Sequence, residues 1–176
     1  MISRRFFVCL AAVGLAAVLF DAVPVAQAPT RKPNANLQQL MRGVLYPSAN
    51  VVFAGQGDLA KFPAAPDASS SPNPLTSSYG GWQAIENAAL ALTESTNLLL
   101  VPGRTCANGK PVPVRRADWI KFVEGLRQAG VAAYKAAQSK NQDAMVEVSG
   151  TVTEACTACH DVYREKPGGV KDRCLP

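Results

Sequence analysis

The sequence is poor in histidine, and this scarcity excludes several kinds of site. His160 is the only histidine among the 176 residues, so two histidines of one chain cannot ligate the same metal. A Ser/His/Asp catalytic set would have to use this same side chain. The carboxylates form no recognisable acid/base pair. We therefore expect that the protein is not an enzyme.

Long basic runs, long hydrophobic runs and strand patterns are also missing. Without a Lys/Arg run or an RNA-binding motif, the chain is not expected to bind nucleic acid. The apolar run at residues 6–20 is shorter than the roughly 20 residues of a membrane-spanning helix, so we expect no membrane span in the mature chain. Apart from residues 51–53, no segment suggests a β-strand.

The N-terminal segment, residues 1–28, has the pattern of a cleavable secretory signal. Arg4 and Arg5 precede the apolar run, and the tripeptide AQA at residues 26–28 matches a cleavage site. An uncleaved anchor is the alternative, and the arginine pair also resembles a twin-arginine signal. Cleavage would leave 16 basic and 12 acidic side chains in residues 29–176, a balance that suits docking on acidic partners.

Four segments show the 3.6-residue periodicity of amphipathic helices. Their small and apolar stripes predict one all-α domain over residues 29–176, an antiparallel four-helix bundle. Proline should bend the first helix, at Pro47, and the proline-rich stretches 57–79 and 102–117 are expected to be loops. The helices are expected from a possible N-cap at Asn34 to residue 53, from 81 to 99, from an Asp118 cap through Ala133, and from Asn141 to a point before Pro167.

The segment CTACH, Cys156 to His160, lies in the last turns of the fourth expected helix and has the C-x-x-C-H signature of covalent haem attachment. On a helix, residues i and i+3 project from nearly the same face, so both thiols can bond one edge of a porphyrin. The adjacent imidazole can then ligate the iron. We therefore predict one covalent haem c, held by Cys156 and Cys159 with His160 as an axial ligand.

Two haem-free alternatives would use the same thiols. A thioredoxin-like dithiol belongs beside a βαβ unit, which this pattern lacks. A structural zinc site needs four ligands and would have to recruit Cys106 and Cys174 from remote loops. Haem is the favoured interpretation.

The sixth position of the iron depends on methionine. Met145 precedes His160 by 15 residues, which is about 22 Å along one helix, so it cannot reach the opposite haem face. Met41 can do so if the first helix packs across the ring. The alternative is that Met41 only fills the core, and that Leu40, Met41 and Phe53 line a pocket with no sixth bond.

These motifs resemble the class II c-type cytochromes, the family of cytochrome c-prime and the low-spin cytochrome c-556 group. The strongest likeness is CTACHDVYREK, with weaker support from LMRGVLYPSANVVF and GGWQAIENAALALTESTNLLL. The resemblance implies a bundle with covalent haem on the C-terminal helix and His160 as proximal ligand. In c-556-like members a first-helix methionine binds the iron, which matches Met41, whereas in cytochrome c-prime the iron stays five-coordinate.

The resemblance also bears on residues around the haem. Arg164 matches a basic position near the proximal side of the ring, and we place Leu40, Phe53 and Trp82 in the haem environment. Many relatives carry an arginine four positions before the distal residue, where this chain has Leu37, so the partner of the haem propionates stays open.

Two cysteines are extra relative to the family. We predict a disulfide between Cys106 and Cys174, which would tie the loop between the second and third helices to the C-terminal tail.

The expected function is electron transfer by a periplasmic protein with low-spin iron bound by His160 and Met41. Haem attachment after export favours the Sec route, so the twin-arginine likeness is taken as coincidence. Redox proteins with acidic docking surfaces are the expected partners, and a homodimer stays open. The alternatives are a five-coordinate protein that binds nitric oxide or carbon monoxide, and a haem-free dithiol or zinc protein.

Overall fold

The computed structural model describes residues 32–175, in which four helical segments pack against one another. The predicted signal segment therefore lies outside the described residues. Within 32–175 there is no strand, only an isolated bridge between Thr105 and Pro111. The all-α, four-helix prediction is confirmed. The first segment combines α1 (Leu37–Leu40), a π-helical turn (Met41–Leu45) and α2 (Tyr46–Ala54), and the others are α3 (Trp82–Ser95), α4 (Ala117–Ser139) and α5 (Gln142–Tyr163).

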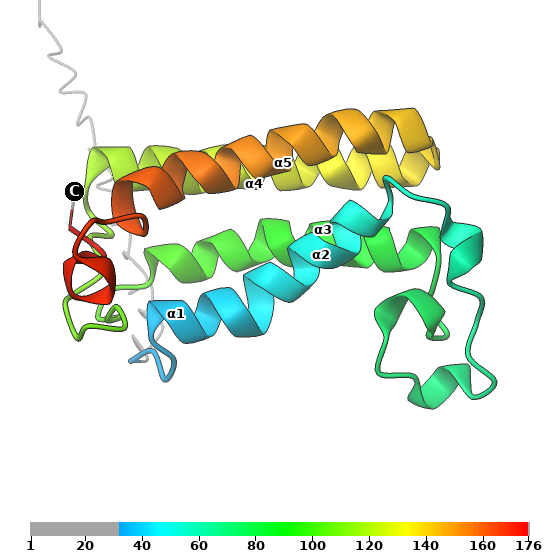
Figure 1. Cartoon of the computed structure of the whole chain (residues 1–176), viewed down its shortest axis with the longest axis horizontal. Helices are drawn as coiled ribbons and strands as arrows, with labels where there is room; N and C mark the ends of the chain where they lie inside the picture. Colours follow the sequence, from blue (N-terminus) through cyan, green and yellow to red (C-terminus); the bar gives the residue numbers. More distant parts are fainter. Residues whose placement is uncertain (1–31, 176) are drawn as a thin grey trace, which may run out of the picture. The chain divides into compact units, whose positions relative to one another are not determined.

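Successive helical segments run in opposite directions, as Figure 1 shows. Only Lys140 and Asn141 separate α4 from α5, and the left-handed backbone of Lys140, with φ of 52°, reverses the chain there. The Asn141 side chain then accepts from the Ala144 amide and caps α5, as predicted. The start of α1 and the end of α5 consequently lie at the same end of the bundle (Figure 1).

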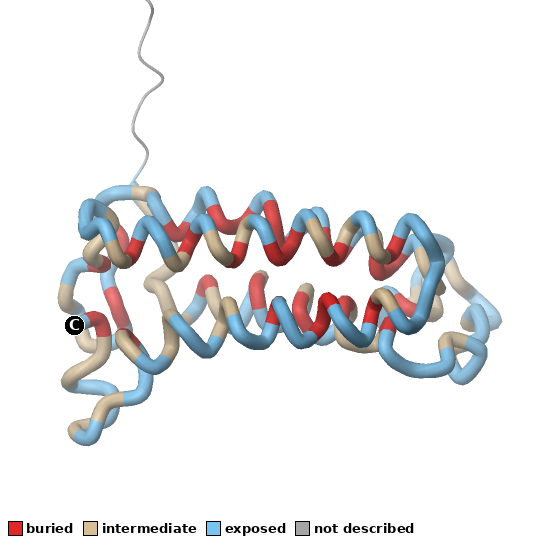
Figure 2. The backbone as a smooth tube through the Cα atoms, turned by 90° about the horizontal axis from the view of Figure 1, so that it is seen from above, coloured by how far each residue is buried: buried red, intermediate tan, exposed pale blue. Residues whose placement is uncertain are grey.

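The helices bury their apolar stripes against one another, and buried positions face inward along both layers of the bundle (Figure 2). Close approach of α3 and α4 is possible because residue 130 is glycine: a Cβ there would lie 2.4 Å from Oγ1 of Thr93. The second expected helix ends in a 3-10 stretch, Thr96–Leu100, that follows α3 directly. The largest fully buried side chains include Trp119, Ile85, Leu92, Met145 and Val52.

The first segment starts two residues later than its predicted cap. Asn36 is the N-cap, because its side chain and that of Gln39 each accept from the other's backbone amide at 2.9 Å. The regular α-helix is interrupted just before Pro47, which agrees with the effect expected of this proline. The interruption is the π-helical turn, after which the Tyr46 amide donates to the carbonyl of Met41.

The loops are tied to the end of the bundle that holds the start of α1. Buried Arg104 donates to the carbonyl of Ala35 at 2.5 Å and to that of Leu98 at 3.3 Å. Cys106 and Cys174 form the predicted disulfide, with their Cα atoms 6.5 Å apart. The tail is held further because the Cys174 amide donates to the Tyr163 carbonyl at 2.9 Å.

The proline-rich stretch 57–79 contains only three short 3-10 turns, which agrees with its expected loop character. The stretch 102–117 is likewise free of long helices until Ala117, where α4 begins. No helix within residues 32–175 has the length and apolar character needed to cross a membrane.

Candidate functional site

A cavity of about 650 Å³ lies where α1 begins and α5 ends. Its volume falls in the range of about 300–1,000 Å³ that is usual for ligand pockets. The cavity brings Met41 and Phe53 of the first segment together with the thiols and imidazole of CTACH. Most of its wall is apolar or aromatic, formed by Leu37, Leu45, Ala49, Leu92, Leu99, Trp119, Phe122, Val123 and Leu126 among others.

The two thiols face the cavity from the last turns of α5. Cys156 and Cys159 are half-buried and unpaired. Burial raises the pKa of the Cys156 thiol. The pKa of Cys159 is raised to about 12, first by burial and then by the nearby Cys156 and Asp118. Both groups are therefore protonated thiols at neutral pH, whereas a reactive redox dithiol has a lowered pKa.

His160 lies directly after these thiols and also lines the cavity. Burial lowers the pKa of its imidazole, and the positive charge of Arg164 lowers it further, so the neutral ring is favoured. Nη1 of Arg164 lies 3.3 Å from Nδ1 of His160, while Nε of Arg164 pairs with the carboxylate of Glu165 at 2.5 Å. A neutral imidazole is the form that binds a metal.

The first segment faces the thiols with a row of side chains spaced four residues apart. The row consists of Leu37, Met41, Leu45, Ala49 and Phe53, all of which line the cavity. Met41 is half-buried and belongs to the π-helical turn. The structure therefore places Met41 and CTACH on two walls of one cavity.

Three aromatic rings line the cavity beside CTACH. The ring of Tyr163 meets that of Trp119 edge to face, with centroids 5.0 Å apart, and that of Phe122 with centroids 6.3 Å apart. Trp119 is fixed further because its Nε1 donates to the Leu99 carbonyl at 3.1 Å. We did not assign these residues to the site from the sequence. The signal was available, because an antiparallel α4 must begin beside the end of α5.

Tyr163 also belongs to a polar cluster with Arg116 and Asp118. The Tyr163 hydroxyl donates to Oδ2 of Asp118 at 2.9 Å and accepts from Nε of Arg116 at 3.1 Å. Nε of Arg116 also pairs with Oδ1 of Asp118 at 3.0 Å. The hydrogen bond from Arg116 is the main reason why the pKa of Asp118 is lowered to about 2. Asp118 is not the helix cap that was predicted, since α4 begins at Ala117.

Acid should weaken this cluster, and the Asp118→Asn substitution tests the effect. Because the folded pKa of about 2 lies below the ordinary value of 3.8, the carboxylate stabilises the fold above that ordinary value. This stabilisation is lost as the pH falls through about 2. Urea unfolding between about pH 5 and pH 2 should therefore show a shallower acid loss in Asp118→Asn than in the unsubstituted protein.

The matched control for this experiment is Asp143→Asn. Asp143 also lies in the first turn of a helix, α5, but it makes no side-chain ion pair in the described chain. Its acid dependence should follow the unsubstituted protein. If Asp118→Asn and the unsubstituted protein lose the same stability as the pH falls, the cluster does not stabilise the bundle.

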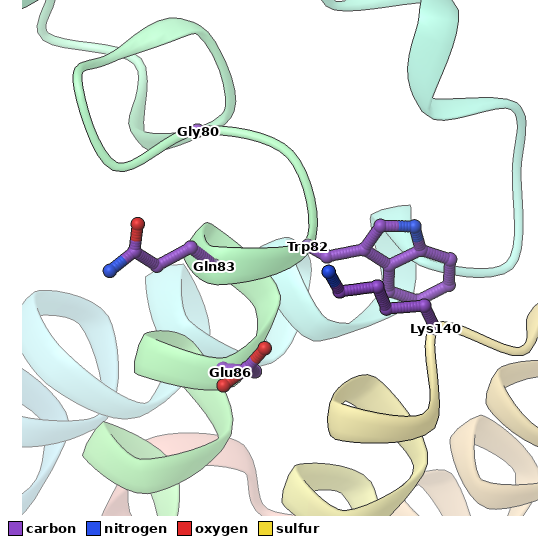
Figure 3. A pocket seen from close by; sticks show the side chains of 5 residues that line it. All are labelled: Gly80, Trp82, Gln83, Glu86 and Lys140. Carbon is purple, nitrogen blue, oxygen red and sulfur yellow. The ribbon is translucent and has the colours of Figure 1, made fainter.

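Two residues assigned to the haem environment do not line this cavity. Leu40 is buried in the core beside Met41, about 100° away around the helix. Trp82 is the first residue of α3, about 15 Å before Leu92 along that helix, so it lies at the other end of the bundle. There it lines a smaller hollow with Lys140 (Figure 3).

The charged groups at the cavity are mainly basic. Arg42, Arg164 and Arg173 line it together with a single carboxylate, Glu165. Leu37 also lines the cavity but carries no charge and cannot pair with an anionic ligand. The three guanidinium groups offer such a ligand several partners. In residues 32–175 no cluster of three or more His, Cys, Asp or Glu side chains could hold a metal ion. Cys106 is already bonded to Cys174 and is not available as a zinc ligand.

A comparison with protein families, with curated proteins and with solved structures finds no match for this chain.

Proposed function

We propose that the protein is a class II c-type cytochrome that carries electrons through one covalent haem c. The observation that carries this proposal is the cavity in which Met41 of the first segment faces Cys156, Cys159 and His160 of α5. The sequence resemblance suggested these residues from two segments more than a hundred positions apart. The packing of the bundle brings them to one site.

The cavity residues fit a haem in three respects. The apolar and aromatic wall suits a porphyrin, and the volume of about 650 Å³ suits a cofactor. Arg42, Arg164 and Arg173 can pair with carboxylates at the edge of the ring. The two thiols follow each other at i and i+3 on one helix face, as thioether attachment requires.

The protein's own residues would then have separate roles. Cys156 and Cys159 would attach the ring, while His160 and Met41 would bind the iron from the two walls. Bound in this way, haem supplies a one-electron couple whose potential depends on its axial ligands. The rings of Trp119, Phe122 and Tyr163 would keep water from the ligands.

The haem-free alternatives have less support. A dithiol would need a reactive thiolate, but burial raises the pKa of Cys156 and holds that of Cys159 at about 12. The thiols also lie near the end of α5, where the helix dipole disfavours a thiolate. A four-ligand zinc site would need Cys106 and Cys174, which bond to each other.

The setting proposed for this activity is the bacterial periplasm, after Sec export and signal cleavage. The disulfide supports an oxidising compartment. Basic groups beside the cavity, Arg42 and Arg164, are exposed and could meet an acidic surface on a redox partner.

One absorption spectrum of the exported protein tests the proposal. We expect a Soret band that survives denaturation and extraction, because the haem is covalent, and a low-spin ferric spectrum. A high-spin spectrum that changes on adding carbon monoxide would favour the gas-binding alternative instead. Protein without a Soret band, made in a host that matures c-type cytochromes, would rule out both haem functions.

A further inference from the structure

The feature that carries a further inference is the π-helical turn at Met41–Leu45. Isolated π-turns within α-helices usually contain one extra residue and often occur at functional sites. Here the turn contains Met41, the proposed sixth ligand, and the Tyr46 amide donates to the Met41 carbonyl five residues back. The chain on either side is α-helical.

The cavity row requires such a turn. An α-helix rotates about 100° per residue, so side chains spaced by four drift about 40° at each step. In a regular helix the side chains of Leu37 and Phe53 would therefore point about 160° apart around the helix axis. Two such directions cannot belong to one wall of a cavity. A turn that takes up one extra residue reduces the angle between these two side chains to about 60°. The whole row then lines the same cavity.

The core gives the same result independently of the cavity. Leu40 and Leu45 are both 5% exposed, although they are five residues apart. In a regular α-helix their directions would differ by about 140°, and one of them would leave the core. With one residue taken up by the turn, the difference falls to about 40°.

Pro47 explains why the extra residue is taken up here. A proline inside an α-helix lacks the amide donor, and its ring clashes with the carbonyl four residues earlier, which is that of Gly43. The π-helical turn ends at Leu45, two residues before Pro47, and it moves that carbonyl out of α-helical register. Both flanks are anchored, at the start by the Leu37 amide donating to Thr105 and at the end by buried Val52.

We propose that the π-helical turn at Met41–Leu45 is the element that positions Met41 as the iron ligand. It takes up one residue, so that the side chain of Met41 stays on the same wall as Ala49 and Phe53 and faces the haem side of the cavity. The inference rests on the proposed function, since it concerns the proposed ligand.

The test changes the number of residues in the turn by one, in both directions. The parent is Pro47→Ala, which allows a regular helix but keeps the chain length. Deleting Gly43 from this parent should give a regular α-helix with Met41 in the same direction. Inserting an alanine after Gly43 should turn Met41 about 100° away from the cavity. Gly43 is exposed, and a Cβ there would meet nothing within 4 Å, so neither change crowds a neighbour.

The expected spectra of the covalent haem proteins differ accordingly. The parent and the deletion variant should stay low-spin, and the insertion variant should become high-spin. A high-spin deletion variant would overturn the proposal, because the deletion would then have moved Met41. A low-spin insertion variant with full helix content by circular dichroism would overturn it as well.

A second measurement separates this proposal from the proposed function. Thermal unfolding needs no haem, and it should show the deletion variant to be at least as stable as the parent. The insertion variant should unfold at a lower temperature, because Leu40 leaves the core. If the insertion variant instead unfolds at the higher temperature, the turn does not take up one extra residue. If the unfolding temperatures follow the expected order but the protein has no Soret band, the turn only keeps the helix in register. The haem function and the positioning role would then both be rejected.

Discussion

Met41→Ala is expected to convert a low-spin iron to a high-spin, five-coordinate iron that binds carbon monoxide. Met41 is the only methionine that lines the cavity of the described chain, and it does so opposite His160. A methyl group cannot ligate iron, so the sixth position would be vacant or taken by water. The measurement is the ferric absorption spectrum, in which the weak long-wavelength band of methionine ligation should vanish.

The matched control for Met41→Ala is Met145→Leu. Met145 is fully buried in α5, at the end of the bundle away from CTACH. Exchanging it for leucine conserves volume and should cost less than about 1.5 kcal/mol in unfolding free energy. Its spectrum should match that of the unsubstituted protein. An unchanged low-spin spectrum in Met41→Ala would show that another group binds the iron.

Replacing both Cys106 and Cys174 by alanine should cause a large loss of stability. The disulfide joins residues 68 positions apart, and in the chain-entropy account closing such a loop contributes about 4 kcal/mol. The unfolding midpoint should then fall by roughly 10–15 °C for a domain of this size. Differential scanning calorimetry of the variant and of the unsubstituted protein measures this.

Asn108→Ala separates the crosslink from the docking of the tail. The Asn108 side-chain amide donates to the carbonyls of Val170, Lys171 and Arg173 at 2.9–3.1 Å. Its loss should cost only about 1–2 kcal/mol while the disulfide holds the tail. Trypsin cleavage after Arg173 should accelerate strongly in the double cysteine variant and weakly in Asn108→Ala. Equal stability of the double variant and the unsubstituted protein would contradict the crosslink argument.

The sequence predicted the four helices well because their stripes and caps are local signals. The Asn141 cap and the loop at 57–79 depend only on nearby residues, and the structure has both. The Asn34 cap was wrong by two residues, since the reciprocal bonds of Gln39 favour Asn36. The Asp118 cap was wrong because its carboxylate binds Arg116 and Tyr163.

The candidate site was less accessible to sequence reasoning, because it depends on how helices meet. The sequence prediction assumed a regular 3.6-residue period throughout the first helix. No local pattern announces a π-helical turn, whose position follows from anchors on both flanks. Trp82 was assigned to the haem environment, although its position along α3 puts it at the opposite end of the bundle.

The disulfide also has a consequence for the order in which the chain matures. The four cysteines of the described chain allow three complete pairings, and each of these would use both thiols of CTACH. The thiols stay free because Cys106–Cys174 is the single bond formed. If the chain is exported from its N-terminus, Cys156 and Cys159 reach the oxidising compartment before Cys174 does. Closing a short loop is entropically easier than closing one of 68 residues. On the proposed export route, both thiols of CTACH would therefore have to stay reduced until Cys174 has reached the oxidising compartment.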